Sequence, residues 1–157
     1  MSEIKLKTEA RNASKLHRSL ILFLLAYEQK LRHWPNFCTH SYSKMFRRSF
    51  DEVLDLTTDA QHSFYKKTAL NNLIKAHERL RIRMWAYYEA GLFSYVRNAQ
   101  KDEKKADERY LHLSGLWDEI GCQIGNWMES EKAKAIAAQK AKKQDQRSNQ
   151  PKDWGDQ

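Results

Sequence analysis

The sequence is poor in residues that end helices and build turns. It holds only five Gly and two Pro among 157 residues. β-Sandwiches and barrels need many turns, and turns depend on Gly and Pro, so the composition argues against these folds. Cysteine is just as scarce, because Cys38 and Cys122 are too few for a disulfide framework or a thiol-rich zinc site. The sequence therefore predicts a helical protein of a reducing, cytoplasmic compartment.

Long apolar runs are also missing. The longest run is Leu20 to Ala26, whereas a membrane-spanning helix needs about 20 apolar residues. No small-residue cleavage site follows that run, which argues against a signal peptide. We therefore interpret it as part of a core helix and predict no membrane association. The length suits one domain.

Apolar residues recur at spacings of three and four in four segments, which is the period of one helical face. We expect helices over residues 16–34, 41–62, 65–90 and about 98–130. Pro35 should end the first helix, and Gly91 lies where the third helix should be capped. Because short connections make neighbouring helices run in opposite directions, the sequence predicts an all-α fold, an antiparallel up-down-up-down four-helix bundle.

The two ends differ in composition from the middle. Residues 1–15 are polar and predict a flexible N-terminal arm before a bundle domain over residues 16–130. Residues 131–157 consist mainly of Lys, Ala, Gln and Asp, with almost no large apolar residue before Trp154. Such a segment cannot bury a core. We expect a basic, largely disordered tail that is helical at first.

Residue patterns for catalysis are absent from the sequence. It has no Gly-rich phosphate loop, no His-Glu-x-x-His pair and no serine in a nucleophile elbow. His33 and His40 flank the first predicted turn near Cys38, but their spacing matches no zinc pattern. The prediction is a protein that is not an enzyme and has no cofactor or metal, with a small enzyme that uses these histidines as the alternative.

Charge is the main positive feature. The chain has 28 Lys+Arg against 20 Asp+Glu, a net charge of +8, which favours polyanions through counterion release. Basic residues one helical turn apart form ridges that suit backbone phosphates, although a charge run can also be only a solvated face. The candidate nucleic-acid-binding residues are Lys44, Arg47, Arg48, Lys66, Lys67, Lys75, Arg79, Arg81 and Arg83.

The fourth predicted helix contains two glycines four residues apart. Gly121 and Gly125 each cost about 1 kcal/mol relative to Ala inside a helix, so a close approach must offset that cost. We expect a small-residue notch beside Trp127 that packs either within the bundle or between subunits. Gly121, Gly125 and Trp127 are therefore the candidate packing or oligomer-interface residues.

This helix also carries a family resemblance, which covers about residues 20–130. Leu116 to Gly121, followed by Ile124-Gly125-Asn126-Trp127, resembles the helix-four motif of the Avd family, the accessory variability determinants of diversity-generating retroelements. Weaker likenesses lie in Ala69 to Leu73 with Leu80-Arg81, and in the Trp34-Pro35 turn. The sequence departs from the family at Cys122 and Trp85, where members usually carry a basic residue.

The resemblance implies a four-helix-bundle protomer that assembles into a basic homopentamer. It also implies binding to the element's reverse transcriptase and to RNA or DNA, in support of mutagenic retrohoming, in which an RNA template is copied with errors and the cDNA replaces a variable region. Bundle proteins encoded in intervening sequences of 23S ribosomal RNA genes are close alternatives. A generic basic helical RNA-binding adaptor, and an interaction module whose charge serves only solubility, also stay open.

Overall fold

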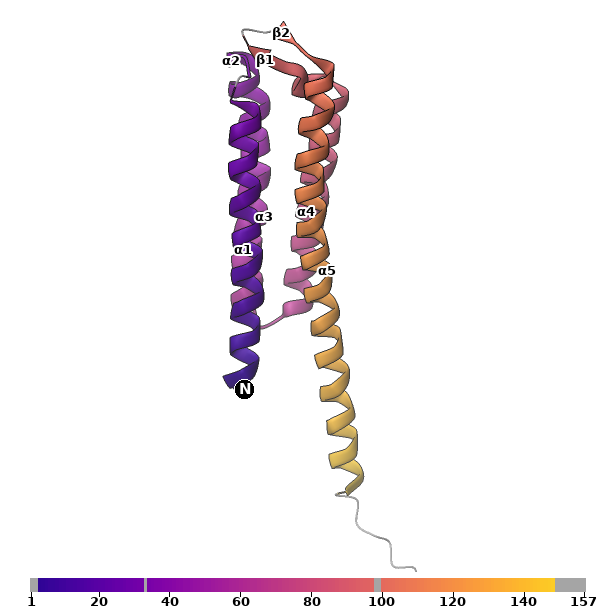
Figure 1. Ribbon diagram of the computed structural model, residues 1–157. Coiled ribbons are helices and arrows are strands. Elements are labelled where there is room, and N and C mark those ends of the chain that lie inside the picture. Colours follow the sequence, from indigo (N-terminus) through magenta and orange to yellow (C-terminus); the bar gives the residue numbers. More distant parts are fainter. Residues whose placement is uncertain (1–2, 33, 98–99, 149–157) are drawn as a thin grey trace, which may run out of the picture.

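Four long helices form most of the computed structural model, which describes residues 3–32, 34–97 and 100–148. Side chains are described for residues 15–32, 34–36, 38–95 and 100–148. The long helices are α1 (Glu3–Leu31), α3 (Lys44–His62), α4 (Lys66–Glu89) and α5 (Glu103–Ser148), as Figure 1 shows. The predicted all-α class is confirmed for the described residues.

The first connection follows from Pro35. This residue precedes the short helix α2 (Asn36–Cys38), and a π-helical turn (Thr39–Ser43) continues it into α3. A proline at this position loses no helical hydrogen bond, because the first amide groups of a helix have no partner within it. The break between the first two long helices therefore lies where the sequence predicts it.

The connection between α4 and α5 contains a small element that the periodicity did not predict. Gly91 follows α4 in the left-handed conformation, with φ of 76°, which glycine adopts without a steric penalty; the predicted cap is confirmed. A 3₁₀ turn (Leu92–Ser94) then leads into an antiparallel hairpin of β1 (Tyr95–Arg97) and β2 (Gln100–Lys101). Strands of two and three residues are too short to give a recognisable alternation.

Each long helix packs against two others. α1 contacts α3 and α5, and α4 contacts the same two helices. Between α1 and α3, His17 pairs with Thr58 and Glu28 pairs with Arg47, so residue numbers rise on one helix as they fall on the other. α1 and α4 therefore lie diagonally across the bundle.

The centre of the core is Trp117 of α5, which is fully buried. The ring of Phe23 lies 4.6 Å from it, and the imidazole of His77 stacks on it at 4.7 Å with an interplanar angle of 4°. The Trp117 indole N–H donates to the His77 carbonyl at 3.0 Å, and His77 Nε2 donates to the Trp117 carbonyl at 2.7 Å. These reciprocal bonds fix α4 against α5 at this level.

Helical structure extends beyond the predicted bundle domain at both ends. α1 begins at Glu3, although the sequence predicts a flexible arm over residues 1–15, and α5 continues through Ser148 into the predicted disordered tail. Both segments lack Gly and Pro and are rich in good helix formers, which explains the continuation. The link between α3 and α4 consists of residues 63–65. In Figure 1 the yellow end of α5 projects past this link. We call residues 129–148 the α5 extension.

Candidate nucleic-acid interface

The nine basic residues predicted to bind nucleic acid all lie on α3 and α4, and these two helices pack together. Seven of them are exposed, whereas Lys66 and Arg83 are half-buried. The structure thus places the whole set on two neighbouring helices. Their availability differs, because several already form ion pairs or hydrogen bonds within the chain.

Three arginines of the set are held by carboxylates. Arg47 pairs with Glu28 of α1 at 2.6 Å, and Arg79 pairs with Glu52 of α3 at 3.0 Å. Arg81 forms a two-pronged contact with Glu78 at 2.5 and 2.8 Å. That contact lowers the pKa of the Glu78 carboxyl and raises the pKa of the Arg81 guanidinium. A phosphate would have to compete with these acids.

Two residues of the set have structural contacts instead. The Lys66 ammonium donates to the carbonyls of Ala60 and Gln61, both at 2.7 Å. It thereby caps the last turn of α3, where the helix dipole favours a cation. Arg83 donates weakly to the Tyr87 hydroxyl at 3.4 Å, and its Nε is buried without a partner among the described residues.

The remaining four residues of the set, Lys44, Arg48, Lys67 and Lys75, are exposed and have no acidic partner among the described side chains. The same outer surface of α3 and α4 is not uniformly basic, because α3 also exposes a row of acids. Those acids are Asp51, Glu52, Asp55 and Asp59. The α3–α4 surface can therefore contact phosphates at separate points, but it does not form one continuous basic ridge.

A denser basic segment lies on the α5 extension. Lys140, Lys142, Lys143 and Arg147 are exposed and have no acidic partner among the described residues. Lys140, Lys143 and Arg147 share one side of the helix, since their spacings are three and four. They are not among the nine predicted residues, because a segment expected to be largely disordered does not place its side chains on one helical face. The Lys-rich composition was the only signal in the sequence.

The two glycines of the predicted notch differ in their surroundings. A Cβ atom at Gly121 would lie 2.7 Å from Cε1 of His77, so this glycine admits the imidazole that stacks on Trp117. A Cβ at Gly125 would meet nothing within 4 Å. Trp127 is buried in the core. Packing within the described chain therefore accounts for Gly121, whereas it gives no reason for Gly125.

Large apolar side chains are exposed on two sides of the bundle. On α1, Ile21, Leu22 and Leu25 are each more than half exposed. On α4, Ile82 and Trp85 are about half exposed. Because α1 and α4 lie diagonally across the bundle, these two apolar surfaces face different directions.

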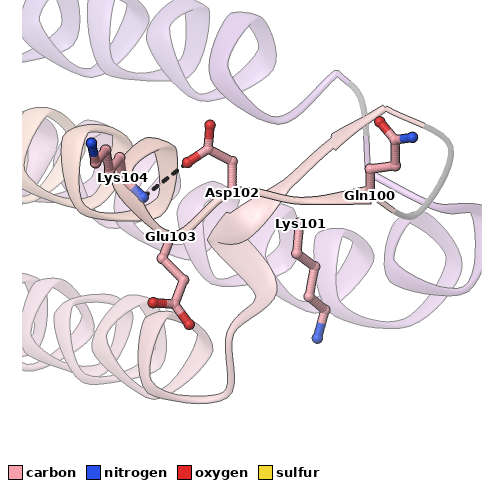
Figure 2. A pocket seen from close by; sticks show the side chains of 5 residues that line it. All are labelled: Gln100, Lys101, Asp102, Glu103 and Lys104. Carbon is pink, nitrogen blue, oxygen red and sulfur yellow. Dashed lines mark hydrogen bonds between the residues drawn. The ribbon is translucent and has the colours of Figure 1, made fainter.

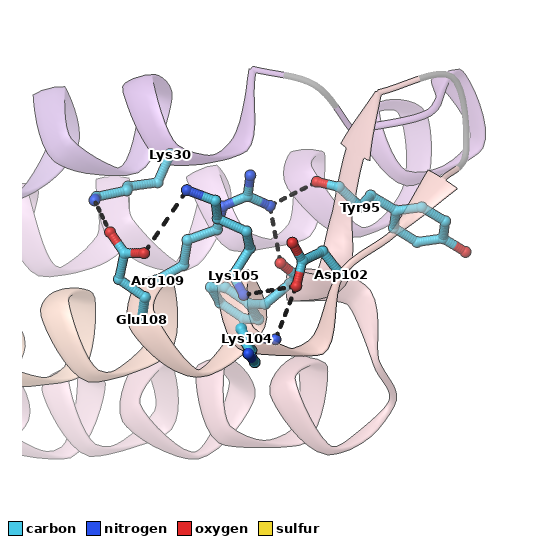
Figure 3. Close-up of polar contacts among 8 residues, drawn as sticks. Lys30, Tyr95, Asp102, Lys104, Lys105, Glu108 and Arg109 are labelled. Atoms are coloured by element: carbon cyan, nitrogen blue, oxygen red, sulfur yellow. Dashed lines mark hydrogen bonds and ion pairs between the residues drawn. The ribbon is translucent and has the colours of Figure 1, made fainter.

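The hairpin end of the bundle is polar. A hollow of about 780 Å³ is lined by residues 100–104. Figure 2 shows the side chains of these residues. Within the hollow, Asp102 Oδ1 accepts the backbone N–H of Lys104 at 3.0 Å and caps the start of α5. Figure 3 shows the adjacent contacts, in which Lys30 reaches Glu108 at 3.8 Å. Lys105 reaches the same glutamate at 3.9 Å, so Glu108 pairs with two lysines at this end.

Arg109 is the buried charge at this end. Its guanidinium donates to the carbonyls of Phe93 at 2.9 Å and Tyr95 at 2.6 Å, and Figure 3 shows it directed toward the hairpin. Burial lowers the pKa of Arg109. The side chain thus satisfies backbone acceptors of the α4–α5 connection, which is a structural role.

Metal binding and membrane insertion find no support within the described residues. No group of three or more His, Cys, Asp or Glu side chains there could hold a metal ion. Of the turn residues considered for catalysis, His40 is exposed, Cys38 is buried with a raised thiol pKa, and His33 lies outside the described residues. No described helix is long and apolar enough to cross a membrane.

Comparisons with protein-family models, with curated proteins and with solved structures gave no match.

Proposed function

We propose that this chain is a non-catalytic accessory protein of a diversity-generating retroelement, an antiparallel up-down-up-down four-helix bundle that binds nucleic acid and the element's reverse transcriptase in the cytoplasm. The observation that carries the proposal is the set of exposed cations without described acidic partners on α3, α4 and the α5 extension. The resemblance of the α5 segment Leu116 to Trp127 to the Avd motif supplies the retroelement context.

The mechanism is electrostatic. Exposed Lys and Arg side chains neutralise phosphates and release counterions, so binding weakens steeply as salt rises. No described feature reads bases, so RNA and DNA are both expected ligands. A preformed scaffold then holds the template close to the polymerase that copies it.

Assembly into a ring, with five protomers as the family resemblance implies, is part of the proposal. Two different apolar surfaces on opposite sides of one protomer are what a head-to-tail contact requires, and such contacts close into rings. The α1 surface (Ile21, Leu22, Leu25) and the α4 surface (Ile82, Trp85) meet that requirement. Gly125, which faces open space in the protomer, is the candidate small-residue contact between subunits.

The test of nucleic-acid binding is the salt dependence of RNA affinity, measured by fluorescence anisotropy. Replacing Lys140, Lys142 and Lys143 with Gln should weaken binding and reduce the slope of log K against log salt by about 0.7 to 0.9 per lost contact. Replacing Lys101, Lys104 and Lys105 with Gln is the matched control, because it removes the same charge at the hairpin end. Equal effects of both triple variants would contradict a localised interface.

A second triple variant separates the two basic regions. Replacing Arg79, Arg81 and Arg83 with Ala tests the α4 arginines, whose guanidinium groups are already engaged with Glu52, Glu78 and Tyr87. The proposal expects a weaker affinity with assembly intact. Unchanged RNA affinity would remove these three arginines from the interface.

Assembly is tested by light scattering after nuclease treatment at high salt. The expected mass is about five times the 18.6 kDa protomer. Gly125→Leu should reduce that mass while the helical content stays unchanged, since a Cβ atom at this position faces open space in the protomer. A monomeric parent protein would refute the ring. Binding to the reverse transcriptase is a separate part of the proposal and would then be tested by co-purification.

A further inference from the structure

A large groove lies where α5 passes the link between α3 and α4. Its volume is about 1150 Å³, and it is bounded by the end of α3, the link, the first turns of α4 and the α5 segment from Met128 to Ala138. Figure 1 shows why it exists: α3 and α4 meet at the link, whereas α5 continues beyond it. Past the link, α5 therefore has neither α3 nor α4 packed against it.

The floor of the groove is apolar. Leu70 of α4, Met128 and Ile136 of α5 line it, and Phe64 lies in the link beside it. Leu70 is buried, but Ile136 is 54% exposed and Phe64 is 89% exposed. Large apolar side chains exposed to water are unfavourable, so an occupant that covers Ile136 and Phe64 would be stabilised by their burial.

The rim of the groove is basic. Four lysines line it against a single acid, Glu131. The lysines are Lys66, Lys67, Lys132 and Lys134. Lys66 is fixed in place by the carbonyls at the end of α3, and Lys67 is exposed. Lys132 and Lys134 pair with Glu129 and Glu131 at 3.3 and 3.2 Å, but the four lysines still outnumber these two acids. An occupant that combines an apolar face with negative charge therefore complements the groove.

The dimensions suit a helix. The ten-residue step from Met128 to Ala138 covers about 15 Å along the axis of α5, which equals nearly three helical turns. An amphipathic helix of that length presents apolar residues at i, i+3, i+4 and i+7, the pattern that fits an apolar groove between helices. A volume above 1000 Å³ is larger than typical small-molecule pockets.

We infer that this groove is a docking site for an amphipathic helix with an acidic polar face, supplied by a partner protein. The α5 extension of a second copy is a poor occupant, because its exposed Lys and Arg residues would meet the lysine rim. Nucleic acid is also a poor fit, since Leu70, Met128 and Ile136 offer a phosphate backbone neither charge nor hydrogen bonds. The inference stands on the groove itself and does not depend on the proposed retroelement function.

The test uses a fluorescein-labelled peptide of about 14 residues, helix-stabilised, with Leu at i, i+3, i+4 and i+7 and Glu on the other face. Binding to the full chain is measured by fluorescence anisotropy. Two control peptides accompany it: one with the same composition but scrambled Leu positions, and one with Lys in place of Glu. The acidic amphipathic peptide should bind at least about tenfold more tightly than either control.

Ile136→Glu is the diagnostic variant, because it places a negative charge in the groove that repels the acidic peptide. Position 136 is an exposed helical position that should tolerate the substitution. It should weaken peptide binding at least about tenfold. Leu111→Glu is the matched control, because Leu111 is an exposed leucine on α5 away from the groove, at 68% exposure; affinity should stay within about twofold. Helical content measured by circular dichroism should be the same for both variants.

Three results would overturn the inference. The first is equal affinity for the scrambled peptide, and the second is an Ile136→Glu variant that binds the peptide as tightly as the parent. The third is displacement of the peptide by single-stranded oligouridine, together with loss of oligouridine binding in Ile136→Glu, which would assign the groove to nucleic acid. The salt-slope experiment with Lys140, Lys142 and Lys143 is independent of all three results.

Discussion

Replacing the α5 glycines one at a time with alanine should give opposite effects on stability. At Gly125 and Gly115, a Cβ atom would meet nothing within 4 Å. Alanine there should raise the free energy of unfolding by about 0.5–1 kcal/mol, because a helical glycine loses more backbone entropy on folding than alanine. Within the protomer, these two variants measure the gain in helix propensity without a steric cost.

At Gly121 the same substitution meets the His77 ring. The new Cβ would lie 2.7 Å from Cε1 and 3.1 Å from Nε2 of that imidazole. The ring cannot move away freely, because it stacks on Trp117 and Nε2 is bonded to the Trp117 carbonyl. Overpacking costs about 1–3 kcal/mol and a strained hydrogen bond about 1 kcal/mol, so the propensity gain is outweighed. We expect a net destabilisation of about 1–3 kcal/mol.

The measurement is denaturant unfolding followed by circular dichroism at a fixed protein concentration. A double-mutant cycle with His77→Ala isolates the clash, since that substitution removes the ring that Gly121 accommodates. In the His77→Ala background, Gly121→Ala should become stabilising, as at Gly125. If Gly121→Ala stabilises the parent protein as much as Gly125→Ala does, the reasoning about the His77 contact is refuted.

Three further predictions concern single side chains. Burial lowers the pKa of His77. Its contribution to the free energy of unfolding is therefore fully present above the unfolded pKa of about 6.5 and is lost as pH falls below that value, by at most about 1.4 kcal/mol per pH unit. Unfolding of His77→Gln, measured as a function of pH, should lack this contribution. Arg109→Met removes the buried donor to the carbonyls of Phe93 and Tyr95 and should cost about 1–3 kcal/mol, with faster amide exchange in the hairpin; unchanged stability would contradict its structural role. Asp102→Ala removes the cap of α5 and should cost about 1 kcal/mol, measured by thermal unfolding; no change would refute the cap.

Sequence periodicity predicts the long helices well, because apolar residues spaced three and four apart form the buried face of each helix. Pro35 and Gly91 mark two of the three connections by their backbone preferences alone. The hairpin of β1 and β2 escapes this reasoning, because it is held by tertiary contacts rather than by a pattern of its own. Arg109 of α5 donates to the carbonyls of Phe93 and Tyr95, and the backbone N–H of Asp102, just before α5, donates to the Ser94 carbonyl. Tertiary contacts of this kind leave no local signal.

The candidate interface shows a different limit of sequence reasoning. Spacing identifies Arg79 and Arg81 as basic residues on an outer helical surface, but it cannot reveal that Glu52 lies opposite the first. The groove beside Ile136 was equally hidden, since it depends on how far α5 continues past the end of α3. Composition indicated a solvated tail that is helical at first, and the helix formers of that segment, without Gly or Pro, continue α5 as far as Ser148.

The length of α5 also determines how the protein moves through solution. Its 46 residues correspond to about 69 Å of helix, roughly twice the length of α4. A rod of this kind experiences more friction than a sphere of equal mass, so diffusion is slower and elution from a sizing column is earlier. Calibration against globular standards would therefore assign too large a mass, and scattered light gives the mass without reference to shape.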